Sequence, residues 1–253
     1  MFENGNRVRF DRSVDAVSRD WWLAAFHAPF GLTPEGMGDL LTRSVGTEKS
    51  IVYRYIDGYE HAFALRVEGR LGSLGEIWFV ERSLSLDGPI FTADEMFVAP
   101  DASQAGLGRR LMGDLLAASR LLGIARVSVE AQRIGRYAWL RMGFIPDGGS
   151  WRTIQLEAPR FIMRHAAYLD GDAPGLIALV LSGKAATARS LAALPHLVPS
   201  LELYDDHGVP VMVALGKAFY IEAAPNWTGE FNFDPDSVAL AERYVASLED
   251  DDG

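Results

Sequence analysis

Hydrophobic residues recur at helical spacing near the start of the chain, which predicts a helix there. Ser13 is its expected N-cap, and Pro29 and Gly31 are expected to end it. Pro34 is placed to open a second, shorter helix that runs to about residue 41. The periodic positions of the first helix are Val14, Val17, Trp21, Trp22, Ala25 and Phe26.

From Ile51 onward the hydrophobic period changes to two. Short segments rich in β-branched and aromatic residues are separated by the turn sequences at 57–58 and 69–72. This pattern predicts an antiparallel meander followed by a fourth strand. The expected strands are 51–56, 61–67, 75–81 and 91–98.

An amphipathic segment follows the loop at 99–105 and predicts a helix over 106–122 that ends at Gly123. One stripe of this helix carries Leu107, Leu111, Leu115 and Leu122. The elements expected next are a strand at 125–130 with Val127 and Val129 inward, a helix at 134–142 and a strand at 151–156. This order predicts a mixed α/β fold, a mostly antiparallel sheet flanked by helices.

The pattern changes again beyond about residue 160, which favours a domain at 1–158 and an accessory α+β region at 159–253. The expected accessory elements are a helix at 173–194, a hairpin of strands 201–204 and 209–215, a third strand at 219–222 and a helix at 238–248. The hairpin is apolar at alternate positions, so it must pack on the first domain, on its own helices or on a second copy of the chain. A homodimer is therefore one expectation.

Composition narrows the function classes. The 253 residues include 34 Asp and Glu against 24 Lys and Arg, a formal charge of -10, which disfavours nucleic acid as a partner. The absence of cysteine excludes disulfides, thiolate zinc sites and cysteine nucleophiles. The histidines show no metal-ligand spacing, so no metal site is expected. The start lacks a signal-peptide pattern and no apolar run has membrane-spanning length, so we expect a cytoplasmic protein without membrane association.

The strongest chemical signal is Gly106-x-Gly108 between the fourth strand and the amphipathic helix. Glycines at such a turn let backbone N–H groups surround a phosphate, and the helix N-terminus favours negative charge. The segment is not a Walker loop, because no Lys-Ser/Thr follows, and it lacks the third glycine of the dinucleotide fingerprint. It therefore predicts an anion site.

A second motif follows about twenty residues after this helix. Glu130-Ala131-Gln132 precedes a helical segment, Tyr137 to Met142, that closes with Gly143-Phe144. With Val98-x-Pro100 and the glycine loop, the chain resembles the GNAT superfamily of acyl-CoA-dependent N-acetyltransferases. The resemblance is dense over 91–146, extends less strongly over 51–156 and does not reach 160–253.

This resemblance implies acetyl-CoA, or another acyl-CoA, with its pyrophosphate on the amides of 104–110 and its pantetheine arm beside 96–98. The family's Arg or Gln of the loop aligns with Ser103, one place before Gln104. The acceptor would be a primary amine on a small molecule or a protein. The implied cofactor residues are Met96, Phe97, Val98, Ser103, Gln104, Ala105, Gly106, Leu107, Gly108, Arg109, Arg110, Gln132 and Trp139.

The attacking amine must be a free base, so a carboxylate is expected to take its proton. Asp94 and Glu95 lie on the cofactor strand, on opposite faces if the period is two. We favour Glu95, because Asp94 shares its face with Met96. Glu76 and Glu81 are further candidates.

The group that protonates the departing thiolate is less clear from the sequence. The tyrosine that serves this role in the family aligns with Trp139, and an indole cannot act as that acid. Tyr137 lies two residues away, roughly 200° around a helix, so it serves only if the helix register differs. Otherwise another group or solvent protonates the thiolate. Trp139 also supports an alternative function, a non-catalytic acyl-CoA-binding module.

Overall fold

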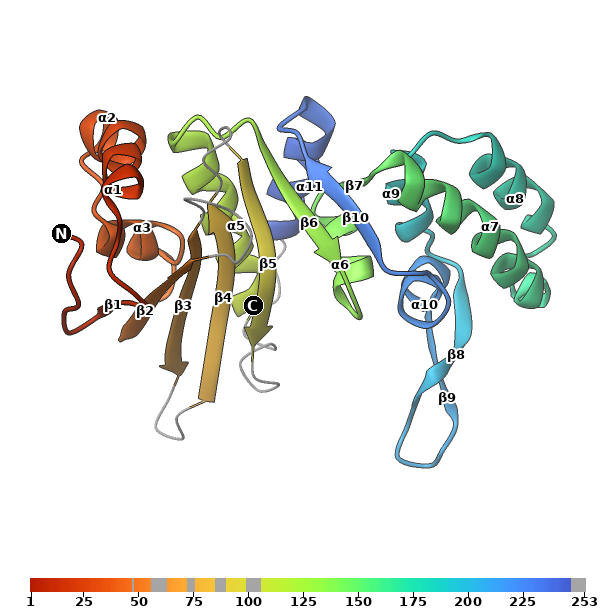
Figure 1. Cartoon of the computed structure of the whole chain (residues 1–253). Coiled ribbons are helices and arrows are strands. Elements are labelled where there is room, and N and C mark those ends of the chain that lie inside the picture. Colours follow the sequence, from red (N-terminus) through yellow and green to blue (C-terminus); the bar gives the residue numbers. More distant parts are fainter. Residues whose placement is uncertain (47, 56–62, 72–75, 85–89, 99–105, 247–253) are drawn as a thin grey trace. The chain divides into compact units, whose positions relative to one another are not determined.

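The computed structural model describes residues 1–46, 48–55, 63–71, 76–84, 90–98 and 106–246 (Figure 1). The chain divides into two units. The first consists of Met1–Ser128 and Arg243–Gly253, and the second of Val129–Glu242.

The first unit is built on a mostly antiparallel sheet. Strand β1 runs parallel to β2, and β2 to β5 pair antiparallel in chain order. The start of β6 (Arg126–Ala131) follows β5, where the hydroxyls of Ser128 and Thr92 are 3.0 Å apart. The other strands are β1 (Val8–Phe10), β2 (Lys49–Tyr55), β3 (Phe63–Leu71), β4 (Glu76–Leu84) and β5 (Ile90–Val98). The four predicted strands are confirmed within the described residues, whereas the short β1 was not predicted.

Alternation gives this sheet two different faces. The inner face is apolar and buried, and it carries Ile51, Tyr53, Leu65, Val67, Trp78, Val80, Phe91 and Ala93. The outer face is polar and aromatic, and it carries Arg54, Arg66, Glu68, Phe79, Glu81, Glu95 and Phe97. Figure 1 looks onto the outer face, with α5 behind the strands.

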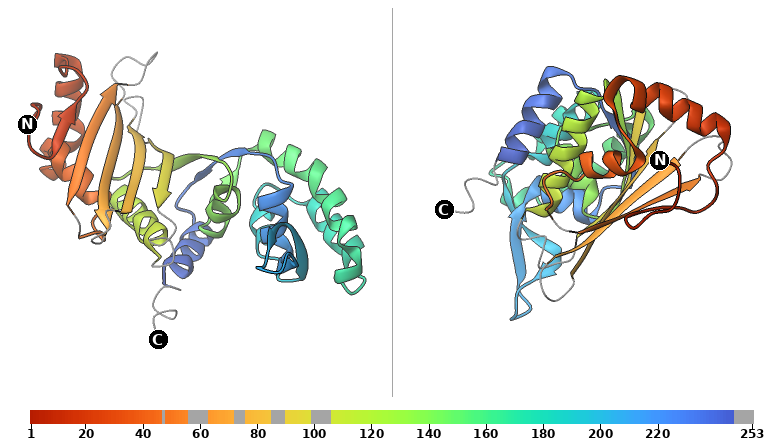
Figure 2. Two further views of the ribbon diagram at one scale, coloured as in Figure 1. Left: turned by 90° about the horizontal axis from the view of Figure 1, so that it is seen from below. Right: turned by 90° about the vertical axis from the view of Figure 1, so that its left-hand side faces the viewer.

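Helices pack on the inner face of the first unit (Figure 2). The Cβ position of Gly38 in α3 lies 2.6 Å from the Ile51 side chain, and that of Gly108 in α5 lies 3.7 Å from the Met96 methyl group. Only glycine allows the first approach. The helical segments are α1 (Ala16–Trp22), the π-helical turn η1 (Leu23–His27), α2 (Ala28–Phe30), α3 (Pro34–Leu40) and α5 (Leu107–Leu121).

The first predicted helix differs in detail from the structure. Its N-cap is Asp15 rather than Ser13, because the Asp15 carboxylate accepts the Ser18 amide at 2.8 Å. Pro29 does not end it but lies in the first turn of α2, where a missing N–H costs little. Gly31, with φ 68°, ends α2 as predicted. Pro34 opens α3, also as predicted, and Thr33 caps it by accepting the Gly36 amide.

The second unit is richer in helices. Strand β10 pairs antiparallel with β7, and β8 pairs with β9 as the predicted hairpin. Both β6 and α11 cross the boundary between the units. The elements after β6 are α6 (Gly135–Arg141), β7 (Ile145–Pro146), α7 (Gly148–Arg164), the 3-10 turn η2 (Ala166–Tyr168), α8 (Ala173–Ser182), α9 (Thr187–Ala192), β8 (Leu197–Tyr204), β9 (Pro210–Ala214), α10 (Leu215–Glu222), β10 (Trp227–Phe231) and α11 (Pro235–Ala246).

The strand predicted at 151–156 is wrong, because this segment lies within α7. The apolar positions that are buried continue past the predicted end at helical spacing, and Pro159 is accommodated inside the helix. Asp147 caps the helix by accepting the Ser150 amide at 2.7 Å. The domain boundary expected after residue 158 also falls inside α7, within the second unit.

The prediction of a third accessory strand at 219–222 is also wrong. This segment forms the end of α10, whose buried residues Leu215, Ala218 and Phe219 follow the helical period. The single helix predicted at 173–194 is two helices, α8 and α9, because Gly183 adopts an extended conformation between them. The last helix is confirmed as α11 within the described residues.

The hairpin packs on α10 through one side only, where Val198 and Ser200 are buried. On its other side Leu197, Leu201 and Met212 are 59%, 47% and 47% exposed. Association of this side with a second copy of the chain stays a prediction. The chain as a whole is a mixed α/β protein with a mostly antiparallel sheet and helices packed against it, which confirms the predicted fold class.

Candidate functional site

The predicted anion site lies where β5 gives way to α5. Gly106 is the N-cap of α5 and has φ 67°, a left-handed conformation that favours glycine. Gly108 in the first turn stands beside Met96 near the end of β5. The helix start and the strand end are therefore neighbours. Ser103, Gln104 and Ala105, which were predicted to bind cofactor, lie outside the described residues.

The start of α5 is electropositive. Helix geometry leaves the first backbone N–H groups without partners inside the helix, and its first turn contains no acidic residue. Arg109 and Arg110 follow directly. The Arg109 guanidinium lies 5.2 Å from the centre of the Tyr244 ring, while Arg110 is exposed. Together these groups favour an anion at this end of the helix.

A β-bulge interrupts β5 at the predicted catalytic residues. Glu95 pairs with Glu81, but Ala93 pairs with Arg82, so Asp94 is the extra residue. The predicted alternation does not hold across this point: Ala93 and Met96 face inward, whereas Glu95 and Phe97 belong to the outer face. The period-two alternation on which the comparison of Asp94 with Met96 rested therefore breaks between Ala93 and Glu95. Glu95 stays the favoured base, and the Asp94 side chain lies outside the described part of the structure.

Arg82 anchors the bulge from the inner face. Its side chain is buried, and its Nη1 donates to the carbonyl oxygens of Glu81, at 2.8 Å, and Glu95, at 3.2 Å. These bonds satisfy backbone acceptors on both sides of the irregular pairing. Arg82 was not among the predicted site residues. The sequence did contain a sign of its special role, since a charged residue occupies an inward position between Val80 and Leu84 in an otherwise apolar alternation.

Glu81 and Glu95 face each other across the outer face but have different partners. The Glu81 carboxylate forms ion pairs with Arg54 and, at 3.9 Å, with Arg66. Glu95 is exposed, and among the described residues no group donates to its carboxylate. The two arginines hold the Glu81 carboxylate in place, whereas the Glu95 carboxylate is available to an incoming donor. The Glu76 side chain lies outside the described set.

Three predicted residues belong to the second unit. Gln132 is exposed and donates to Glu130 at 2.9 Å. Tyr137 is half-buried, and its hydroxyl accepts from Arg141 at 3.2 Å. Trp139 is buried, with its ring 4.9 Å from that of Phe144. On α6, Trp139 thus packs in the core of the second unit, while Tyr137 stays closer to solvent.

The Gly143-Phe144 motif has a structural explanation within the second unit. Gly143 has φ 94°, and a Cβ there would lie 2.5 Å from the Ser237 carbonyl oxygen. Phe144 is fully buried. Arg189 donates to both carbonyl oxygens of the motif and to Ser237. Burial lowers the pKa of Arg189 from its usual value. The motif therefore tightens the packing of α6, α9 and α11.

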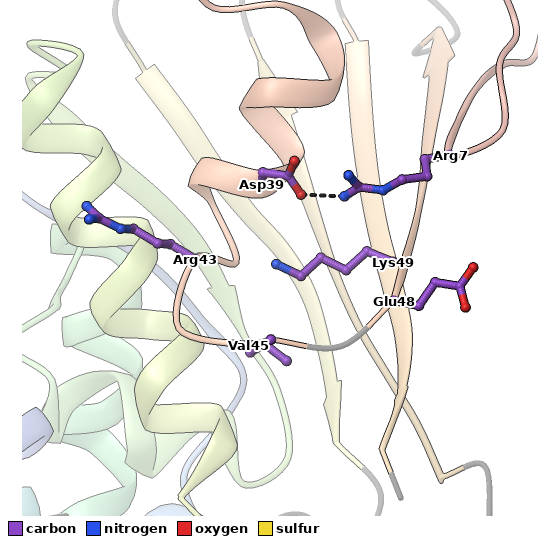
Figure 3. Close-up of a pocket in the computed structure, with 7 residues that line it drawn as sticks. Arg7, Asp39, Arg43, Val45, Glu48 and Lys49 are labelled. Atoms are coloured by element: carbon purple, nitrogen blue, oxygen red, sulfur yellow. Dashed lines mark hydrogen bonds and ion pairs between the residues drawn. The ribbon is translucent and has the colours of Figure 1, made fainter.

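An open surface pocket of about 550 Å³ lies elsewhere in the first unit (Figure 3). Three of its charged side chains already have partners: Arg7 pairs with Asp39 at 2.5 Å, and Lys49 donates to the Thr42 carbonyl oxygen at 2.6 Å. Burial lowers the pKa of Lys49. Figure 3 shows Arg43 pointing away from these groups, so the lining cations do not converge. The pocket contains none of the predicted site residues.

In the described parts of the chain, no group of three or more histidine, aspartate and glutamate side chains is placed to hold a metal ion. Among the helices described, none is both long and apolar enough to cross a membrane.

Comparisons with known proteins gave one partial similarity. Neither a family model nor a curated protein matches the chain. A search of solved structures found similarity to the crystal structure of nourseothricin acetyltransferase, with 27% identity over 34% of this chain and a TM-score of 0.29. The match covers 52% of that chain, so the similarity spans about half the length of that acetyltransferase.

Proposed function

We propose that this protein is an N-acetyltransferase that moves an acetyl group from acetyl-CoA to a primary amine. The observation that carries the proposal is the junction of β5 and α5. Here a bulged strand bearing Glu95, a carboxylate without a donor among the described residues, ends beside the electropositive, glycine-opened start of a helix. An anion site and a candidate base thus lie on one strand–helix connection.

The residues at this junction fit a nucleotide thioester. The backbone N–H groups of 106–110, with Arg109 and Arg110, would bind its diphosphate. The end of β5, Met96–Val98, would lie along the pantetheine arm. Among the described residues, the Met96 methyl group is the one neighbour that a Cβ at Gly108 would have within 4 Å. Acetyl-CoA supplies the activated acyl group.

In the proposed reaction, Glu95 accepts a proton from the amine, and the free amine then attacks the thioester carbonyl carbon. A C–N bond forms, the C–S bond breaks, and the thiolate leaves with the electron pair of that bond, while the nitrogen releases its second proton to solvent to give the neutral amide. Backbone N–H groups beside the bulge would stabilise the oxyanion. Solvent protonates the thiolate, whose conjugate acid has a pKa of about 8.5. Tyr137 is the proposed alternative acid.

A non-catalytic acyl-CoA-binding module is the second candidate. Trp139 favours it, because a buried indole occupies the position where the resembling family has its acid. Both candidates need the same cofactor site but differ in turnover. Release of free thiol from acetyl-CoA in the presence of amines therefore separates them.

The proposal is tested by two variants, each of which introduces one negative charge at a different position of α5. Gly108→Glu puts a carboxylate where the diphosphate would lie, and CoA affinity measured by calorimetry is expected to fall at least about 100-fold. Ala117→Glu is the matched control, exposed on the same helix about 13 Å further along. It is expected to bind CoA as the parent does. Equal affinity of the parent and Gly108→Glu would reject the site.

A further inference from the structure

Two phenylalanines on the outer face form a stacked pair beside Glu95. Phe79 and Phe97 are partners across β4 and β5, and their rings lie 5.6 Å apart at 19°. The Arg66 guanidinium lies 3.7 Å from the centre of the Phe79 ring and is held by Glu68 at 3.2 Å. Arg66, Phe79 and Phe97 thus form a row in which the Arg66 guanidinium covers Phe79 and Phe97 lies at the end. Phe97 is 45% exposed, which is high for a phenylalanine.

The charges around this pair leave one carboxylate available. Arg66 pairs with Glu68, and Arg54 with Glu81, so these four charges balance. Glu95 adds one negative charge without a donor among the described residues. It stands two residues before Phe97 on the same face, which places their Cα atoms about 7 Å apart. An open aromatic ring and an available carboxylate therefore lie side by side.

We propose that Glu95 and Phe97 form the acceptor subsite and that it takes a primary amine carrying an aromatic ring. The ammonium group would meet Glu95, and the ring would extend the Arg66–Phe79–Phe97 row by stacking on Phe97. The inference rests on the proposed acetyl transfer and narrows its acceptor class.

The near-parallel stack favours a flat ring over an aliphatic chain. Aromatic pairs gain attraction beyond the area they bury, and a ring offered to Phe97 can repeat the geometry that Phe79 already has. An aliphatic amine would gain only the burial of its carbon atoms. The subsite is expected to prefer amines that carry an aromatic ring and to bind their ammonium group through Glu95.

The test compares 2-phenylethylamine with ethylamine as acceptors, measuring thiol release from acetyl-CoA. The parent is expected to use 2-phenylethylamine with kcat/KM at least about 10-fold higher. Phe97→Leu is expected to remove most of this preference, measured as the ratio of the two kcat/KM values within the same variant, so that any change in cofactor binding common to both amines cancels. Phe30→Leu is the matched control, since Phe30 is also an exposed phenylalanine of the first unit, 41% exposed, and it should keep the preference.

Binding of 2-phenylethylamine, followed by saturation-transfer NMR, separates the two proposals. Binding that is lost in Phe97→Leu and weakened in Glu95→Gln, together with no thiol release from any amine, would support the subsite and reject acetyl transfer. Turnover with equal kcat/KM for the two amines would reject the subsite and retain acetyl transfer. Absence of both binding and preference, or a preference that survives Phe97→Leu, would overturn the inference.

Discussion

The two faces of the sheet in the first unit use the same strands for different purposes. On the inner face Trp78 and Val80 are almost fully buried, and Gly69 lies so close to Trp78 that a Cβ would be 2.8 Å from its ring. On the outer face the neighbouring positions carry ion pairs and the exposed Phe97. Because alternation separates these roles, single substitutions can change stability or chemistry independently.

The largest expected effect is on the inner face. Trp78→Ala should lower the free energy of unfolding by about 3–5 kcal/mol, because it removes a large buried ring from close-packed surroundings. The exposed Phe97→Ala on the outer face is the control, with an expected loss below about 1 kcal/mol. Urea unfolding followed by circular dichroism measures both. Similar losses in the two variants would contradict the distinction between the faces.

On the outer face the effect should be on turnover. Glu95→Gln removes the proposed base and should lower kcat about 10²–10⁴-fold. Its unfolding free energy should stay within about 0.5 kcal/mol of the parent, since the carboxylate is exposed.

Glu81→Gln is the matched control, on the opposing strand and in the same register. It should weaken the ion pairs with Arg54 and Arg66 but retain turnover. Steady-state kinetics of both variants shows which of the two carboxylates turnover requires. If Glu81→Gln lost turnover and Glu95→Gln kept it, the assignment of the base would be reversed.

The inward side chain of Arg82 binds the backbone of Glu81 and Glu95, whose own side chains lie on the outer face. Its replacement should therefore affect both stability and turnover, each by a smaller amount. Arg82→Met leaves the carbonyl oxygens of Glu81 and Glu95 without their buried donor, which should cost about 1–3 kcal/mol of stability. If Arg82 also positions Glu95, kcat should fall and the rate–pH profile should shift, with the KM for acetyl-CoA unchanged. Arg82→Lys, which keeps a donor, should recover part of kcat. A stability loss with normal kcat would leave Arg82 a purely structural role.

The smallest expected effect concerns Lys49, a buried cation on the inner side of β2. Burial lowers its folded-state pKa below the unfolded value, so the unfolded chain binds more protons between the two pKa values. Stability attributable to this group therefore rises as pH increases through that window. Lys49→Met should remove this rise and change the unfolding free energy at neutral pH by less than about 1 kcal/mol. Unfolding curves of the parent and of Lys49→Met at several alkaline pH values would measure this difference. If the free energy of unfolding had the same pH dependence in both proteins, the prediction would be refuted.

Local pattern was enough to predict much of the first unit. The stripe of Leu107, Leu111 and Leu115 predicted the helix that carries the proposed anion site, and Gly106 marked its start. The pattern failed at 151–156, where a short window of apolar residues fits either period and only the continuation to Phe161 and Ile162 reveals a helix.

The arrangement around Glu95 was beyond local reasoning. Asp94 becomes a bulge only through the register between β4 and β5, which no residue of β5 specifies alone. In the same way, the sequence places both Glu81 and Glu95 on strands without showing which of them will have cationic partners. They differ because β2 and β3 bring Arg54 and Arg66 to one of them.

The central claim is that the start of α5 binds the diphosphate of CoA. Titration of ¹⁵N-labelled protein with CoA tests it directly through the amide signals of Gly106 to Arg110. We expect these amides to shift progressively and to saturate, with little change in the amides around Ala117 on the same helix. Saturable CoA binding that leaves the amides of Gly106 to Arg110 unshifted, or no binding at all, would contradict the account.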